Sequence, residues 1–142
     1  MNVLDASVII KWFIVEEDSD KATYLRKEYM KNLTQIAVPD LMLYELTNAL
    51  RFNKNITSDK IIMALQAIFD IELSIVTPTL SELKRAISIS EEFDVSIYDS
   101  TYLALASLID FQLITADEKF YRKIISKNKN LNIKLLKNII IN

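Results

Sequence analysis

The sequence predicts an α/β fold, a three-layer α/β/α sandwich with a central, mostly parallel sheet of four to five short strands. Short apolar runs alternate along the chain with longer segments of helical periodicity, which is typical of β-α-β units. The chain has 142 residues, of which 51% are hydrophobic and 25% are charged. This length and balance are enough for one hydrophobic core, so we expect residues 1–142 to form a single domain.

The candidate strands are residues 2–4, 36–38, 73–76, 111–115 and 133–136, and we expect the last of them at a sheet edge. The candidate helices are residues 6–13, 19–31, 41–53, 58–71, 80–93, 99–109 and 118–126. Asp40, Thr57 or Ser58, and Thr79 are suitable N-caps for three of them. The helix that Asp99 begins is apolar on nearly every side, so it must be buried.

Three residue types are absent, and each absence excludes a class of site. Without cysteine or histidine there is no disulfide, zinc-thiolate site, thiol nucleophile or Ser-His pair. Without glycine there is no Walker loop, GxGxxG turn or GxSxG nucleophile elbow. Catalysis is left mainly to carboxylate, hydroxyl, amide, lysine and arginine groups. We expect Asn32, Asn53, Asn55 and Asn128 at the left-handed turn positions that glycine usually takes.

The hydropathy of the chain predicts a cytoplasmic protein without a signal peptide or membrane span. No segment offers about 18 uninterrupted apolar residues. The apolar N-terminal stretch up to Val15 is interrupted by Asp5 and Lys11.

The charges are unevenly distributed, although the net charge is only -2. Residues 119–142 hold seven basic and no acidic groups, whereas residues 1–118 hold ten basic and nineteen acidic groups. Two interpretations of the basic segment stay open. It is either a solvated helix followed by a lysine-rich edge strand, or a surface that binds a nucleic-acid backbone.

Four acidic residues are predicted to meet at one edge of the sheet. Asp5 follows the strand at 2–4, and Asp117 lies just beyond the strand at 111–115. Ligands of parallel sheets bind beyond the carboxyl ends of the strands. Asp99 stands at the start of the apolar helix, and Glu45 lies on the apolar face of the helix at 41–53.

A structural role is the competing interpretation of these acids. Asp5, Asp99 and Asp117 each occupy a position where an aspartate can cap the following helix. Glu45 is far from its helix end, and burying an isolated carboxylate costs several kcal/mol unless it is paired or bound to a cation. A salt bridge to a lysine or arginine would satisfy Glu45. We favour a Mg²⁺ or Mn²⁺ ion shared among the carboxylates, which would permit metal-assisted phosphodiester hydrolysis.

Four segments carry a family resemblance. They are VLDAS at 3–7, PDL at 39–41 with YELTNAL at 44–50, YDSTYLALA at 98–106, and LITAD at 113–117 followed by Phe120. Together they resemble the motifs of PIN-domain nucleases and, more narrowly, of VapC-type toxins from toxin–antitoxin pairs. The resemblance spans the whole chain, and four motifs in this order are a specific signal.

The resemblance implies a PIN-like fold and a ribonuclease that requires Mg²⁺, with Mn²⁺ as a substitute. It implies that Asp5 and Asp99 are direct metal ligands and that Glu45 and Asp117 complete the pocket as ligands or as holders of bound water. Ser7 and Thr115 would be hydroxyl neighbours of the metal or phosphate, and Asn48 a further lining residue. The implied partners are an RNA substrate, a second copy of the chain in a homodimer, and a small antitoxin that blocks the pocket.

Two alternatives compete with this hypothesis. A phosphatase of the haloacid dehalogenase type requires a second aspartate two residues after its nucleophile, and Ser7 stands there. The other alternative is a non-catalytic α/β module that binds a protein partner and uses its acids only as caps and in salt bridges.

Overall fold

Five parallel strands form the central sheet of the computed structural model, which describes residues 1–142, in the order β3-β2-β1-β4-β5. Their bounds are β1 (Asn2–Leu4), β2 (Ile36–Pro39), β3 (Ser74–Val76), β4 (Gln112–Thr115) and β5 (Ile133–Leu135). In the middle of the sheet, Val3 lies opposite Ala37 on one side and Leu113 on the other. The predicted parallel sheet is confirmed, and β5 is an edge strand as expected.

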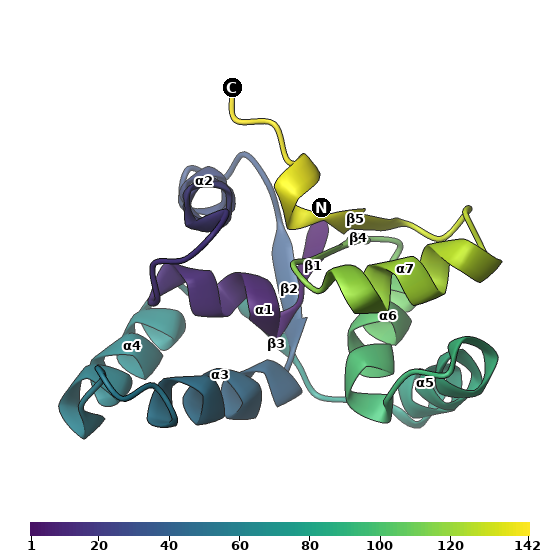
Figure 1. Ribbon diagram of the computed structural model, residues 1–142, viewed down its shortest axis with the longest axis horizontal. Coiled ribbons are helices and arrows are strands. Elements are labelled where there is room, and N and C mark those ends of the chain that lie inside the picture. Colours follow the sequence, from purple (N-terminus) through teal and green to yellow (C-terminus); the bar gives the residue numbers. More distant parts are fainter.

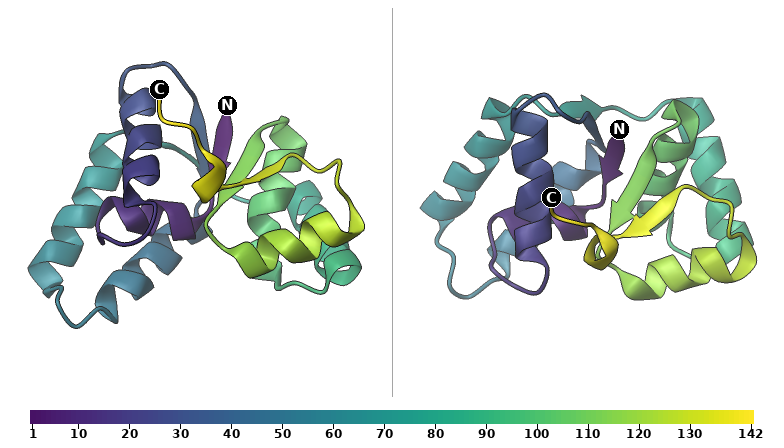
Figure 2. Two further views of the ribbon diagram at one scale, coloured as in Figure 1. Left: turned by 45° about the horizontal axis from the view of Figure 1, so that its top comes forward. Right: turned by 90° about the horizontal axis from the view of Figure 1, so that it is seen from above.

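Helices cover both faces of the sheet, which makes the three layers visible in Figures 1 and 2. One face carries α1 (Ala6–Ile9), the 3-10 turn η1 (Ile10–Trp12), α2 (Ser19–Met30), α3 (Leu41–Arg51) and α4 (Ser58–Asp70). The other face carries α5 (Leu80–Phe93), α6 (Ile97–Ile109) and α7 (Glu118–Lys127), and a second 3-10 turn, η2 (Leu136–Asn138), follows β5. Because the chain winds outward in both directions from the middle, the strand order reverses between β1 and β4.

Helix α6 is the central helix of its layer and contacts β1, β2 and β4. Its residues from Ser100 to Ala106 are all buried, which confirms the predicted burial of this apolar helix. No helix of the protein combines the length and the apolar character needed to cross a membrane. The predicted start at Asp99 is wrong by two residues, because Ser96 is the N-cap and its Oγ accepts a hydrogen bond from the Asp99 backbone N–H (3.0 Å).

Two of the three predicted N-caps are confirmed. The Thr57 side chain accepts a hydrogen bond from the Lys60 N–H, and the Thr79 side chain accepts one from the Glu82 N–H. Asp40 does not cap α3, because its backbone is already helical and its side chain makes no cap hydrogen bond. The Asp40 N–H donates to the Val76 carbonyl (3.0 Å) instead, which continues the pairing of β2 with β3.

The left-handed turn positions differ from the prediction except at Asn32. Positive φ angles occur at Asp18, Asn32, Glu72, Asp94 and Asp110. The side chains of Asn53 and Asn128 instead accept a hydrogen bond from the backbone N–H two residues further on, which forms a local turn without a positive φ. Aspartate thus takes most of the positions that glycine would fill, and Glu72 takes one without the local hydrogen bonding that favours aspartate there.

Replacing Glu72 with glycine is expected to stabilise the protein by about 1 kcal/mol, because a left-handed backbone costs a residue with a Cβ roughly 1–2 kcal/mol and costs glycine much less. The contact of the Glu72 carbonyl, which accepts a hydrogen bond from the Tyr29 hydroxyl, is kept. The measurement is urea unfolding of Glu72→Gly. The control is Glu91→Gly inside α5, where glycine should destabilise; a loss of stability at both positions would contradict the prediction.

Candidate functional site

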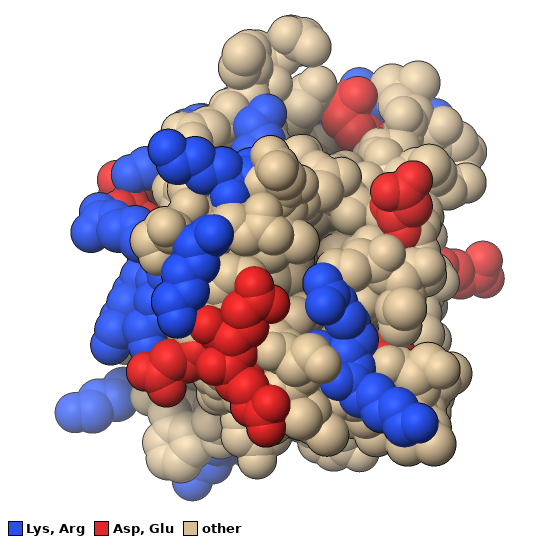
Figure 3. All heavy atoms as spheres, turned by 90° about the vertical axis from the view of Figure 1, so that its right-hand side faces the viewer, with Lys and Arg blue, Asp and Glu red and all other residues tan.

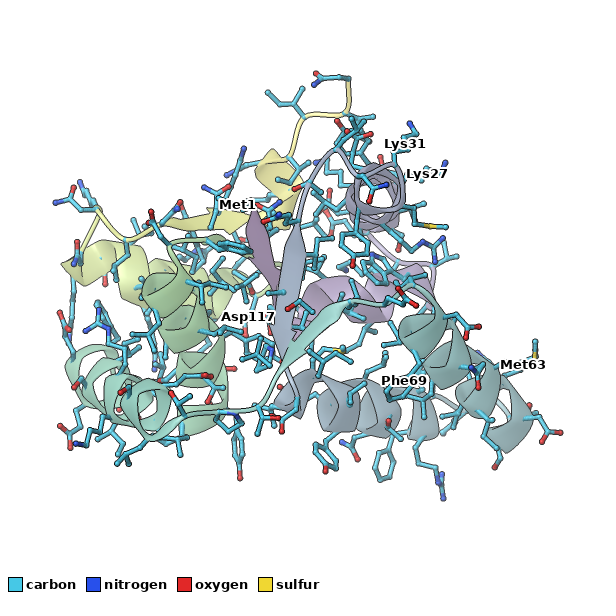
Figure 4. The ribbon with its side chains drawn as sticks, turned by 180° about the vertical axis from the view of Figure 1, so that it is seen from behind. Met1, Lys27, Lys31, Met63, Phe69 and Asp117 are labelled. Carbon is cyan, nitrogen blue, oxygen red and sulfur yellow. The ribbon has the colours of Figure 1, made fainter.

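The four acids predicted from the sequence surround the point where the strand order reverses. Asp5 directly follows β1, and Asp117 follows β4 after one intervening residue. The Asp5 N–H donates to the Ile114 carbonyl (3.0 Å), which ties the end of β1 to β4. Glu45 reaches the site from α3 in one helical layer, and Asp99 from the first turn of α6 in the other. Figure 4 shows Asp117 near the middle of the molecule, between the two groups of helices.

Two hydroxyl groups hold the side chain of Asp5. Its Oδ2 accepts hydrogen bonds from Ser7 Oγ and Thr115 Oγ1, each at 2.7 Å. These hydroxyls in turn accept the backbone N–H groups of Ala116 and Asp117, each at 3.0 Å, so the pair is fixed by the chain that leaves β4. Asp5 occupies the N-cap position of α1, but its side chain makes no cap hydrogen bond. The capping interpretation is therefore wrong for Asp5, and no hydrogen bond engages its Oδ1.

Glu45 is satisfied by a tyrosine rather than by a salt bridge. Its Oε1 accepts a hydrogen bond from the Tyr102 hydroxyl (2.7 Å), and no lysine or arginine pairs with it. Tyr102 lies on α6, is 1% exposed, and was missed in the sequence analysis. The sequence contained a signal for this contact, because a tyrosine in a helix buried on every side needs a partner for its hydroxyl. The other carboxylate oxygen, Oε2, makes no hydrogen bond.

The two remaining aspartates differ in their structural role. Asp117 is the N-cap of α7, and its Oδ1 accepts the Phe120 N–H (2.9 Å), so the capping interpretation is confirmed for this residue. Its Oδ2 makes no hydrogen bond. Asp99 is not a cap, since Ser96 performs that role for α6. In each of Asp5, Glu45 and Asp117, one carboxylate oxygen therefore accepts a hydrogen bond and the other accepts none.

Burial and like charges both act against ionisation of these acids. Burial raises the pKa of Asp5, and the charges of Asp99 and Asp117 raise it further, while the hydrogen bonds from Thr115 and Ser7 lower it. Burial likewise raises the pKa of Glu45, with added repulsion from Asp5 and Asp99. Burial and the charge of Asp117 raise the pKa of Asp99. The four acids are thus close enough to repel one another, and a bound cation would favour their ionised forms.

The arrangement is looser than the sequence analysis expected. No three of the acids converge tightly enough to form a complete set of metal ligands by themselves. The donor set nevertheless suits a hard divalent ion, because it offers only oxygen atoms and leaves one oxygen each of Asp5, Glu45 and Asp117 without a hydrogen bond. Magnesium retains several waters and takes one or two carboxylates directly, so it requires no closed cage of protein ligands.

Asn48 does not lie with the acids. It is exposed and lines a separate hollow between α3 and α4 together with Tyr44, Arg51 and Phe69. No hydrogen bond links it to any of the four carboxylates. Figure 4 labels Phe69 and Met63 on α4, two residues that are 57% and 70% exposed.

The chain belongs to the PIN domain family, whose match covers residues 3–124. A curated relative, Ribonuclease VapC3 of Pyrobaculum aerophilum, is 26% identical over 125 residues, which are 85% of this chain and 92% of the relative. Solved structures of other proteins share the fold. VapBC2 of Rickettsia felis, bound to a DNA fragment from its promoter, has a TM-score of 0.70 at 16% identity and covers 94% of this chain and 97% of its own.

The second structure is Mycobacterium tuberculosis VapC20, a toxin described as cleaving the sarcin-ricin loop. Its TM-score is 0.67 at 14% identity, with 85% of this chain and 93% of its own covered. The family resemblance stated from the four motifs and the predicted PIN-like fold are therefore both confirmed.

Replacing Glu45 with glutamine is expected to raise the melting temperature of the metal-free protein by roughly 2–4 °C at pH 7.5. The pKa of Glu45 is raised above its ordinary value of 4.5, so the folded protein binds this proton more tightly than the unfolded chain does. Protonated Glu45 therefore stabilises the folded protein. This stabilisation is fully present below pH 4.5 and is lost as the pH rises through the raised pKa of Glu45. Glutamine keeps an acceptor for Tyr102 without the charge, so its advantage should disappear near pH 4. Thermal melts in chelator at several pH values measure this.

The matched control is Glu91→Gln, at an exposed glutamate of α5, which should change the melting temperature little at any pH. A large fall in the melting temperature of metal-free Glu45→Gln would contradict the expectation and show that the charged form of Glu45 stabilises the fold.

Proposed function

We propose that this protein is a metal-dependent ribonuclease that hydrolyses RNA phosphodiester bonds, and that it is the toxin of a VapBC-type toxin–antitoxin pair. The observation that carries the proposal is the gathering of four carboxylates at the strand-order reversal of a PIN-domain sheet. The name of the curated relative, a ribonuclease, supports the activity. A ribonuclease without histidine needs another way to activate water and to neutralise phosphate charge, and acids that bind a metal ion provide it.

In this proposal Asp5 and Asp99 would hold Mg²⁺ or Mn²⁺ directly, and Glu45 and Asp117 would complete the site as further ligands or as holders of bound water. When bound, the ion supplies Lewis acidity and a more acidic water. The chain contributes orientation: Ser7 and Thr115 fix one oxygen of Asp5, so that the other is presented to the site. Tyr102 does the same for Glu45 and remains a proton donor, because burial and the charges of Asp5 and Glu45 raise the pKa of its hydroxyl.

The proposed protein partners are a small antitoxin and a second copy of this chain. The solved relatives include a toxin–antitoxin complex from Klebsiella pneumoniae, with a TM-score of 0.70 at 15% identity, which supports an antitoxin as partner. Large apolar side chains on α3 and α4, among them Tyr44 and Phe69, are exposed in the single chain and are available for such contacts.

The test is cleavage of a labelled RNA by the purified protein with Mg²⁺ or Mn²⁺. Asp5→Asn and Asp99→Asn are each expected to lower the rate by at least about 100-fold, since even indirect metal contacts contribute 10–100-fold. Chelation of the metal should abolish cleavage, and Glu91→Gln should cut like the wild type. Circular dichroism confirms that the variants are folded.

Two results would overturn the proposal. If both aspartate variants cut as fast as the wild type, the site is elsewhere. If the wild type cuts no RNA with either metal, the chain is a non-catalytic binding module of the PIN fold.

A further inference from the structure

A hollow of about 270 Å³ lies beside the four carboxylates, between the start of α7 and the turn that precedes α6. Two of the site acids, Asp99 and Asp117, line it together with two lysines of α7, Lys119 and Lys123. Asp94, at the end of α5, is the other charged residue of its wall. Acidic and basic groups therefore share one small cavity next to the proposed catalytic site.

We propose that Lys119 and Lys123 form a subsite for the sugar–phosphate backbone of the substrate RNA, beside the phosphate that is cleaved. This inference rests on the proposed ribonuclease function and adds to it the residues that hold the strand. The two lysines are four residues apart on a helix, so they lie on the same face one turn from each other. Their charges complement the phosphate backbone that the site must bind.

Lys119 has no structural role that accounts for its position. It is exposed and makes neither a hydrogen bond nor a salt bridge. It lies in the first turn of α7, where a positive charge opposes the helix dipole. Its neighbour Arg122 and the later Lys137 are both paired with Glu118, each at 2.7 Å, whereas Lys119 is left without a partner. An unpaired lysine at an unfavourable helix position beside a cavity is available for an anion.

Lys123 is held beside the same acids. Its Nζ donates to the Asp94 carbonyl (2.6 Å) and lies 3.9 Å from Asp94 Oδ2, and its side chain is 39% exposed. It is also near enough to Asp99 for its charge to lower the pKa of that carboxyl. The contact with Asp94 fixes the lysine at the hollow, and the exposed part of its side chain can meet a ligand there.

The size of the hollow suits one sugar–phosphate unit, and its charge suits a phosphate when a divalent ion is bound at the neighbouring acids. At about 270 Å³ it is smaller than the roughly 300–1,000 Å³ of pockets that enclose drug-sized ligands, so it suits one sugar–phosphate unit. Three carboxylates on its wall would repel an anion, but a divalent ion at Asp99 and Asp117 would reverse that balance. Figure 3 views the molecule from the side of α5 and α7. Lysine and arginine side chains gather at the left of this view, with acidic side chains next to them.

A purely structural role for the α7 lysines is the competing explanation. Lys127 donates to the Glu92 carbonyl (2.7 Å) much as Lys123 donates to that of Asp94, so both neutralise the carboxyl end of α5. That role explains Lys123 and Lys127 but not Lys119. Lys127 is therefore a matched control: it has the same helix, charge and kind of contact, but it does not line the hollow.

The experiment measures binding and cleavage separately. Binding of a short fluorescent single-stranded RNA is followed by anisotropy between 50 and 300 mM KCl in otherwise wild-type protein, with Ca²⁺ in place of Mg²⁺ because Ca²⁺ also binds carboxylates but is the weaker Lewis acid. Lys119→Ala and Lys123→Ala are each expected to weaken binding about 3- to 10-fold at low salt and to reduce the slope of log K against log salt by about 0.7. Lys127→Ala and Lys84→Ala, on α5, should change binding less than about 2-fold. Lys119→Arg should restore it.

A loss of RNA binding by Lys119→Ala would not reflect unfolding, because this substitution should leave the melting temperature unchanged or slightly raised. Equal effects of all four alanine variants, or none, would overturn the subsite. Cleavage by the wild type with unaltered binding by Lys119→Ala and Lys123→Ala refutes the subsite and leaves the ribonuclease function intact. Absence of cleavage by the wild type refutes the function itself, whatever the lysine variants do.

Discussion

The burial of like charges at Asp5, Glu45, Asp99 and Asp117 is the constraint around which the rest of this site is arranged. Burial, with added repulsion from neighbouring acids, raises the pKa of Asp5, Glu45 and Asp99, so holding them ionised costs stability unless donors or cations offset that cost. The protein supplies donors to one oxygen of three of these acids: two hydroxyls for Asp5, a tyrosine for Glu45 and a backbone N–H for Asp117. The remaining oxygens are free to bind a cation.

The sheet topology brings these acids together from distant parts of the chain. Because the helices that follow β1 and β4 leave toward opposite faces, their first residues diverge and leave space at the carboxyl ends of the two strands. Asp5 and Asp117 stand at that space, and α3 and α6 extend Glu45 and Asp99 toward it from the two helical layers. Helix α6 is fully buried through Ser100 to Ala106, so its position relative to the sheet is strongly constrained.

Helix α7 connects the acidic site with the basic part of the chain. Its N-cap, Asp117, belongs to the acids, whereas its next turns carry the lysines that line the adjoining hollow. Every acidic residue of the sequence lies before residue 119, so the acidic site and the basic C-terminal segment meet at the start of α7. In the proposed function, a strand of RNA that reaches the acids would meet the lysines of α7 next to them.

Local signals in the sequence determined which segments form strands and helices and which acids occupy strand ends, because periodicity, capping residues and apolar runs act over a few neighbouring residues. Thr57 and Thr79 cap as predicted for that reason, and Asp5 and Asp117 were placed correctly at the ends of their strands. The absence of histidine, cysteine and glycine excluded whole classes of chemistry without any knowledge of the fold.

Only the tertiary structure decided which of these residues interact. The Tyr102 partner of Glu45, 57 residues away, and the pair of hydroxyls on Asp5 depend on contacts between layers and strands that no local pattern encodes. The same holds for Asp40, whose N–H pairs with β3 and whose side chain does not cap α3. It also holds for Asn48, which lines a different hollow. Local propensities are weak free energies, and packing and hydrogen bonding across the fold override them wherever the two compete.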